Sequence, residues 1–335
     1  MNNDTSTPRP QPKGDAGTSR LATGRRTVLG HYIAIARPDH WTKNLFVLPG
    51  FFLGTLATHS PVGSLLAPLI AGLVATCLVS SANYTLNEWL DRKFDSFHPK
   101  KRARPSVGGQ VRSQGVYFQY ACLALSGLGI SATINHAFFL TSLSLLFMGL
   151  VYNVAPIRTK DRSYLDVLSE SVNNPIRLCL GWFIPVPHTF PPSSILLAYW
   201  FGGAFLMAVK RFAEFRTIDN PEIAGLYRRS FRFYTEESLL ASSVFYAMTA
   251  SLFLGVFLIK YRIELLLSFP MIAGLFSWYL RMGFDEDSAA QHPEKLLGQR
   301  TFMLYVLLVA LFVALLFIVE IPQLHSLLHT TFPEM

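Results

Sequence analysis

Charged residues are scarce in this chain of 335 residues. They make up 15% of it, against about 25% in an average soluble domain, whereas apolar residues make up 51%. This balance excludes a disordered chain and argues against a water-soluble enzyme. Cysteine is scarcer still. Cys77, Cys122 and Cys179 lie in apolar runs without C-x-x-C spacing, which predicts buried small apolar side chains and neither a disulfide framework nor a zinc site.

Several catalytic signatures are also missing. The nine histidines show no H-E-x-x-H or similar metal spacing. The chain has no Walker loop, no Rossmann glycine fingerprint and no recognisable Ser-His-Asp pattern. Any chemistry must therefore come from other residues.

Long apolar runs dominate the sequence instead. A helix that crosses the hydrocarbon core of a bilayer needs about 20 mostly apolar residues. Nine segments meet or approach this length, although the first is short and interrupted by Pro49-Gly50 and the fifth carries polar residues. The predicted fold is therefore all-α: a polytopic membrane protein with nine transmembrane helices. The segments are 44–58, 64–86, 116–134, 137–154, 165–184, 194–209, 239–259, 265–280 and 302–320.

The remaining sequence predicts one membrane domain between two tails. Residues 1–30 are polar, rich in Pro, Thr, Gly and Arg, and without the apolar stretch of a signal peptide, which predicts a disordered cytoplasmic tail. We predict the membrane domain over 31–325 and a short C-terminal tail over 326–335.

Positive charge lies on one side of the predicted membrane map. The net charge is +8, and 26 of the 29 Lys and Arg residues fall in the N-terminal segment and in alternate loops along the nine spans. Basic residues in short loops mark the cytoplasmic face, which predicts a multi-pass protein of the cell (inner) membrane with its N-terminus inside and its C-terminus outside. Cations spread over five segments of one membrane face also argue against nucleic acid as a partner.

The second span runs into a polar stripe. Asn87, Asp91 and Asp95 recur at i, i+4 and i+8, so on a helix they share one face. Two carboxylates and an amide can hold Mg²⁺ against a diphosphate, although an isolated D-x-x-x-D is more often a solvated helix end. A dense basic run follows at 98–105, and its cations beside the carboxylates fit a metal-bound phosphate ester. By itself, this run would serve equally as a topology signal or an anionic-lipid contact.

A second polar group follows the fourth span and continues into the fifth. It contains Tyr152, Lys160 and Asp166. Asp166 is either a helix N-terminal charge stabilised by the helix dipole or a second metal ligand or base. Arg177 lies eleven residues later, about three turns, so both side chains can face one cavity. Charges inside spans are costly in lipid, which predicts a polar cavity among the helices, open to the cytoplasmic side.

The sixth span ends in a third polar group. Lys210 and Glu214 form an i, i+4 pair there, with Arg211 between them. The pair could be a surface ion pair. Because it lies on the same predicted face as the other two groups, it is about equally compatible with binding of a substrate phosphate.

Taken together, these residues resemble the UbiA-type intramembrane prenyltransferase superfamily over about 33–320. The resemblance implies nine helices around a central cavity and two acid-rich motifs that bind Mg²⁺ and a diphosphate. Asn87, Asp91 and Asp95 fit the first motif. Tyr152-Asn153, Lys160 and Asp166 fit the second region. The full D-x-x-x-D of many members is missing there, because Asp161 and Asp166 are five residues apart.

Further matches resemble one branch, the decaprenyl-phosphate phosphoribosyltransferases. In that branch phosphoribosyl diphosphate is the donor and a polyprenyl phosphate lipid is the acceptor, and diphosphate is released during synthesis of cell-envelope glycan precursors. The rest of the superfamily uses a prenyl diphosphate donor. The matching residues are Arg37-Pro38 with Trp41 and Lys43-Asn44, the run 98–105, Ile176-Arg177 with Gly181, the run 210–214, and Tyr234-Thr235.

The resemblance implies roles for individual residues. Asp91, Asp95 and Asp166 are the expected catalytic carboxylates, and Asn87 joins Asp91 and Asp95 as a ligand of Mg²⁺. The expected substrate-binding residues are Lys43, Asn87, Lys101, Arg102, Arg104, Tyr152, Lys160, Arg177, Lys210, Arg211 and Glu214.

Two alternatives remain at this point. One is a prenyltransferase that joins a prenyl diphosphate to an aromatic or other acceptor. The other is a membrane transporter, although the charges gather at one face and the sequence shows no inverted repeat. The sequence leaves homo-oligomerisation open.

Overall fold

A computed structural model describes residues 27–98, 100–218, 220–285, 288–291, 296 and 298–324. These residues form helices and connecting segments and contain no strand. The elements are α1 (Val28–Ala36), η1 (Pro38–Phe46), α2 (Val47–Thr58), α3 (Val62–Asp95), η2 (Lys101–Ala103), α4 (Ser113–Ile134), α5 (His136–Asn153), η3 (Thr159–Asp161), α6 (Leu165–Ser171), α7 (Asn173–Trp182), α8 (Ser193–Ile218), α9 (Pro221–Tyr227), η4 (Arg229–Phe233), α10 (Glu236–Tyr261), η5 (Ile263–Ser268), α11 (Phe269–Met282), η6 (Ala289–Gln291) and α13 (Arg300–Ile318), with η marking 3₁₀ helices.

The prediction of an all-α, polytopic membrane protein is confirmed. Within the described residues, seven helical segments are long and apolar enough to cross a membrane. They match seven of the nine predicted spans. They are α3, α4, α5, α8, α10, the pair η5 and α11, and α13.

The other two predicted spans form shorter helices. In the part of the chain that the structure describes, seven helical segments and not nine are therefore long and apolar enough to cross a membrane. In 44–58, the α-helix begins only at Val47, after the nine-residue 3₁₀ helix η1. In 165–184, the chain forms α6 and α7, which meet at Val172. Asn173, Asn174 and Pro175 begin α7, and such residues favour helix starts over helix interiors.

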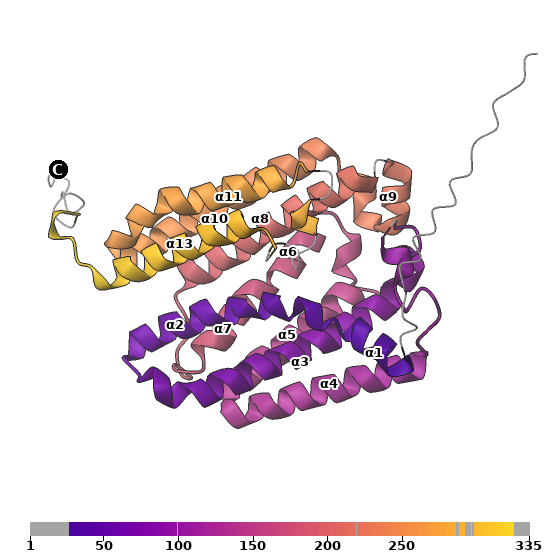
Figure 1. Ribbon diagram of the computed structural model, residues 1–335, viewed down its shortest axis with the longest axis horizontal. Helices are drawn as coiled ribbons and strands as arrows, with labels where there is room; N and C mark the ends of the chain where they lie inside the picture. The colour runs from indigo at the N-terminus through magenta and orange to yellow at the C-terminus, as the bar shows by residue number, and fades with distance from the viewer. Residues whose placement is uncertain are drawn as a thin grey trace, which may run out of the picture.

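Helix packing divides the bundle into two halves. In Figure 1, α2, α3, α4, α5 and α7 lie in one half, and α8, α10, α11 and α13 lie in the other. The most extensive helix contacts agree with this division: α8 packs on α10, α3 on α4, and α2 on α7. Helices α1 and α9 lie at the same end of the bundle.

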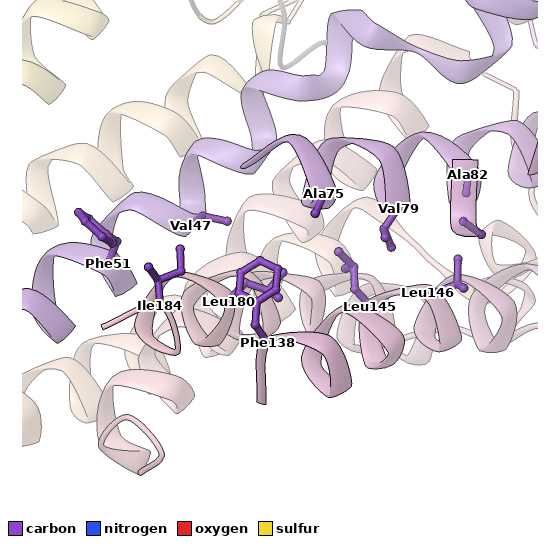
Figure 2. Packing of buried hydrophobic residues seen from close by; sticks show 11 residues of the cluster. Val47, Phe51, Ala75, Val79, Ala82, Phe138, Leu145, Leu146, Leu180 and Ile184 are labelled. Atoms are coloured by element: carbon purple, nitrogen blue, oxygen red, sulfur yellow. The ribbon is translucent and has the colours of Figure 1, made fainter. Parts of the chain in front are cut away.

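An apolar cluster holds the first half together. Val47 and Phe51 of α2 pack with Val79 of α3, Phe138 of α5 and Leu180 of α7, as Figure 2 shows. All five side chains are buried. Outward-facing leucines remain exposed on α13, as expected for a surface that contacts lipid chains.

Helices α2 and α7 touch through their backbones. A Cβ atom on Gly50 would lie 1.9 Å from the carbonyl oxygen of Leu178, and one on Gly181 would lie 1.9 Å from that of Val47. Neither position has room for a side chain. This glycine seam, formed by Gly50 and Gly181, fixes the distance between the two helices.

The predicted tails lie mostly outside the described residues. Residues 1–26 and 325–335 are not described, so the disordered N-terminal tail and the short C-terminal tail stay predictions. The predicted boundary at residue 30 falls within a helix, since α1 begins at Val28. Thr27 caps that helix by accepting a hydrogen bond from the Gly30 amide at 3.2 Å.

Candidate active site

A cavity of about 830 Å³ opens among α1, η1, α3, α5, α7, α8 and α9. It gathers side chains that are far apart in the sequence and that sequence reasoning placed together. Of the predicted site residues, those that line it are Lys43, Asn87, Asp91, Asp95, Lys101, Arg104, Tyr152, Arg177, Lys210, Arg211 and Glu214.

Three predicted site residues lie elsewhere. Lys160 lines a small hollow beside the cavity and pairs with Asp91. Asp166 is fully buried and lies behind Arg211, to which it is bonded. Arg102 is exposed and does not line the cavity.

The predicted polar stripe lies on one continuous helix. Helix α3 has 34 residues and is therefore about 51 Å long, longer than a hydrocarbon core of about 30 Å. Its polar end can thus project beyond the apolar layer. Asn87, Asp91 and Asp95 all face the cavity from this end. Acidic groups near a helix C-terminus oppose the helix dipole, so these carboxylates need partners from other segments.

Those partners are cations from two neighbouring loops. Asp91 accepts hydrogen bonds from Lys160 Nζ at 2.5 Å and Arg158 Nη2 at 2.8 Å. Asp95 accepts one from Arg104 Nη1 at 2.6 Å. Burial lowers the pKa of Lys160 to about 8, against the opposing attraction of Asp91.

The stripe fits a hard divalent cation such as Mg²⁺. The donors are two carboxylates and the amide of Asn87, and Mg²⁺ is usually held by one or two carboxylates, water and substrate phosphates. No cluster of three or more His, Cys, Asp or Glu side chains suited to a metal is found in the part of the chain that the structure describes. A metal here would therefore depend on substrate oxygens to complete its coordination.

Glu214 is at the centre of a second polar cluster. Its carboxylate accepts hydrogen bonds from Lys101 Nζ at 2.6 Å, Tyr227 Oη at 2.8 Å and Arg211 Nη1 at 3.1 Å. Glu214 is buried, so it is not part of a surface ion pair, which was one of the two interpretations of its i, i+4 spacing with Lys210. Burial also lowers the pKa of Lys101, against the attraction of Glu214.

Asp166 holds two arginines in place. It accepts hydrogen bonds from Tyr234 Oη at 2.7 Å, Ser230 Oγ at 3.2 Å and Arg211 Nε at 3.3 Å. Arg228 Nη1 lies 3.6 Å from the same carboxylate. Arg211 and Arg228 line the cavity, whereas Asp166 does not. Asp166 thus holds Arg211 and Arg228 at the cavity wall, and its role as a second metal ligand or base stays a prediction.

We expect Asp166→Asn to weaken substrate binding and to lower the free energy of unfolding by about 1.5–3 kcal/mol, the usual worth of hydrogen bonds to a charged group. Arg211 and Arg228 would lose their shared counter-charge and shift in the cavity wall. KM for the substrate should rise more than kcat falls, measured together with thermal unfolding in detergent. Glu236→Gln is the control, because Glu236 is exposed and its ion pair with Arg216, at 3.6 Å on the surface, contributes little to stability. A collapse of kcat with unchanged KM and stability would instead assign Asp166 to the chemistry.

Arg177 also lines the cavity. Its Nε donates to Asn44 Oδ1 at 3.0 Å, and its Nη1 to the Asn173 carbonyl at 3.3 Å. Asn44 also accepts from Ser80 Oγ at 3.1 Å. These neutral partners tie η1, α3 and α7 together at this level of the cavity.

Sequence reasoning missed several residues that line the cavity. Glu88 follows Asn87 and lies 4.0 Å from Arg104 Nε. His98 begins the run 98–105 but is not among the expected substrate-binding residues, and it packs edge-on against Tyr227. Arg228 entered the sequence analysis only as one of the 26 basic residues on the predicted cytoplasmic face. The basic pair Arg228-Arg229 lies on the same predicted face as the stripe, but its spacing along the chain does not link it to the other polar groups.

Comparison with known proteins agrees with the all-helical membrane fold. The profile of the UbiA prenyltransferase family matches residues 45–306. The chain is an integral, multi-pass membrane transferase. It belongs to the UbiA prenyltransferase family.

Individual relatives are more distant. Nodulation protein NoeC of Azorhizobium caulinodans is 28% identical over 233 residues, which cover 68% of this chain and 71% of NoeC. A 4-hydroxybenzoate octaprenyltransferase of Klebsiella pneumoniae is 24% identical over 227 residues, covering 67% and 74%. The structure of a UbiA homolog from Archaeoglobus fulgidus bound to GPP and Mg²⁺ aligns with a TM-score of 0.65 and 22% identity, over 86% of this chain and 98% of that one.

Proposed function

We propose that this protein transfers a 5-phosphoribosyl group from phosphoribosyl diphosphate to a membrane polyprenyl phosphate and releases diphosphate. The observation that carries the proposal is the polarity of the cavity. Nine Lys and Arg side chains line it, whereas only three large aliphatic side chains do: Ile33, Leu145 and Met207. A small donor with several phosphates matches such a wall better than a long prenyl chain does.

The proposed reaction replaces one bond to the anomeric carbon of ribose by another. The bond from that carbon to the diphosphate oxygen breaks, and a bond to a phosphate oxygen of the lipid forms. Asn87, Asp91 and Asp95 would hold Mg²⁺, which when bound would neutralise charge on the leaving diphosphate. Lys101, Arg104 and their neighbours bind and orient the same anion from beside the stripe.

The acceptor needs little activation. A phosphate monoester is already ionised at neutral pH, so no strong general base is required. Arg211 and Arg228 provide positive charge on the cavity wall for such anions, and Asp166 holds both in place. The isoprenoid tail would lie against the apolar outer surface of the helices, with its phosphate at the margin of the bilayer.

The topology predicted from charge belongs to the same proposal. With the N-terminus inside the cell, the polar end of α3 and the cavity lie on the cytoplasmic side, where the water-soluble donor is supplied. The cell envelope is the expected destination of the lipid product.

A single assay tests the proposed function. Purified protein is incubated with Mg²⁺, a polyprenyl phosphate and phosphoribosyl diphosphate labelled in the ribose. We expect label in the lipid fraction, dependent on Mg²⁺ and abolished by EDTA. Absence of lipid-linked label, together with turnover of a prenyl diphosphate, would refute the proposal.

Prenyl transfer is the second candidate. It is favoured by the family match and by relatives described as 4-hydroxybenzoate octaprenyltransferases. The matched assay replaces both substrates by geranyl diphosphate and 4-hydroxybenzoate. Product in this arm alone would assign prenyl transfer to the cavity.

A further inference from the structure

The cations that line the cavity differ in their partners. Most of them, such as Arg104 and Arg211, have a carboxylate oxygen within 4.0 Å. Lys43, Arg177 and Lys210 have none at that distance among the residues that the structure describes. Lys43 Nζ lies 5.6 Å from the centroid of the Tyr84 ring, a weaker cation–π contact.

These three cations come from separate elements and share one region of the cavity. Lys43 is on η1, Arg177 on α7 and Lys210 on α8. Lys43 and Lys210 are close enough to repel each other. Arg177 is bonded to Asn44, the residue next to Lys43. The nearby Glu214 is already bonded to Lys101, Arg211 and Tyr227.

Cations held together without counter-charge are unfavourable unless a ligand supplies the missing negative charge. We propose that Lys43, Arg177 and Lys210 form a metal-free site for a phosphate monoester, the 5-phosphate of the sugar donor. This inference rests on the proposed function and assigns the two ends of the donor to different parts of the cavity.

The site is distinct from the metal-binding stripe. Asn44 bonds both Arg177 and Ser80, so Ser80 of α3 marks the level of Arg177, and Lys43 lies over the ring of Tyr84, about one turn further along α3. Asn87 lies seven residues and Asp91 eleven residues beyond Ser80, which places them about 10 Å and 16 Å from the level of Arg177 along the helix axis. One cavity thus carries a metal-dependent anion site and a metal-independent one.

A neighbouring amide favours a sugar phosphate over a lipid phosphate. Asn173 lines the cavity and donates from Nδ2 to the Glu170 carbonyl at 3.0 Å. Its Oδ1 is buried and accepts no hydrogen bond from the described residues. A ribose hydroxyl can supply that donor, whereas a prenyl chain cannot.

The test is a binding measurement that requires no turnover. Labelled ribose 5-phosphate is titrated into the full-length protein in detergent with EDTA, and pyrophosphate is titrated separately with Mg²⁺. We expect Arg177→Met and Lys210→Met to weaken ribose 5-phosphate binding at least tenfold while retaining Mg²⁺-pyrophosphate binding, which also shows that they fold. Asp91→Asn should show the reverse pattern. Lys210→Arg should retain ribose 5-phosphate, and Lys93→Met, an exposed lysine outside the cavity, should match the wild type.

Two results would overturn the inference. One is equal ribose 5-phosphate binding by wild type, Arg177→Met and Lys210→Met. The other is metal-free binding of geranyl phosphate without any binding of ribose 5-phosphate, which would assign the cations to the lipid. If ribose 5-phosphate binds as expected but no label reaches polyprenyl phosphate, the site stands and the proposed reaction fails.

Discussion

Asp91→Asn is expected to lower kcat at least about a thousandfold, the equivalent of about 4 kcal/mol of transition-state stabilisation. The substitution keeps the shape of the side chain but removes a charge that would hold Mg²⁺ on the leaving diphosphate. The cations around it keep other partners. Arg158 also bonds Asp161 and the Asn153 carbonyl, and Lys160 bonds Asn153 Oδ1. The variant should therefore stay folded in the membrane.

Initial rates over a range of Mg²⁺ concentrations would measure this effect, with thermal unfolding measured in parallel. The matched control is Asp285→Asn, an exposed acid that does not line the cavity, and it should retain wild-type rates. Retained activity in Asp91→Asn would remove the metal assignment from the stripe.

The second large effect concerns folding. Gly181→Ala should lower the free energy of unfolding by about 3 kcal/mol or more, the upper end of the cost of overpacking. The new methyl group would lie 1.9 Å from the Val47 carbonyl oxygen and 2.6 Å from the Phe51 amide nitrogen. Both obstacles are backbone atoms of α2, so no rotamer change can relieve the contact. Gly50→Ala should lower the free energy of unfolding by a similar amount, because its methyl group would clash with the Leu178 carbonyl oxygen.

Folded yield after detergent extraction and the midpoint of thermal unfolding would measure the loss. Gly129→Ala and Gly255→Ala are the controls, because nothing lies within 4 Å of a Cβ at either helical position. Both should equal or slightly exceed the wild type, since alanine favours a helix by about 1 kcal/mol over glycine. A Gly181→Ala protein as stable as these controls would contradict the close approach of α2 and α7.

Long apolar runs made most of the fold predictable. A run such as 302–320 has one stable conformation in lipid, a helix, because every backbone hydrogen bond must be made within the segment. The runs around α2 and α6–α7 are harder to interpret. Asn173, Asn174 and Pro175 mark the break between α6 and α7, but the placement of α7 beside η1 depends on distant contacts, such as the hydrogen bond from Arg177 to Asn44, which no local pattern contains.

The candidate site was predictable in part for a related reason. Asn87, Asp91 and Asp95 share one helix, so their common face follows from helical periodicity. The partners of each carboxylate come from distant segments. Lys160 rather than Arg102 reaches the stripe, and Arg228 reaches Asp166. These pairings depend on how the loops cross the end of the bundle, which the order of charges along the chain does not encode.

The glycine seam has a mechanical consequence for turnover. Two helices in backbone contact cannot slide or separate without losing that contact, so α2 and α7 are expected to move as one rigid unit. Lys43 and Asn44 lie just before one helix and Arg177 lies on the other. Their spacing should therefore be preserved when the cavity changes shape. Any change in the width of the cavity would then involve the helices outside this pair.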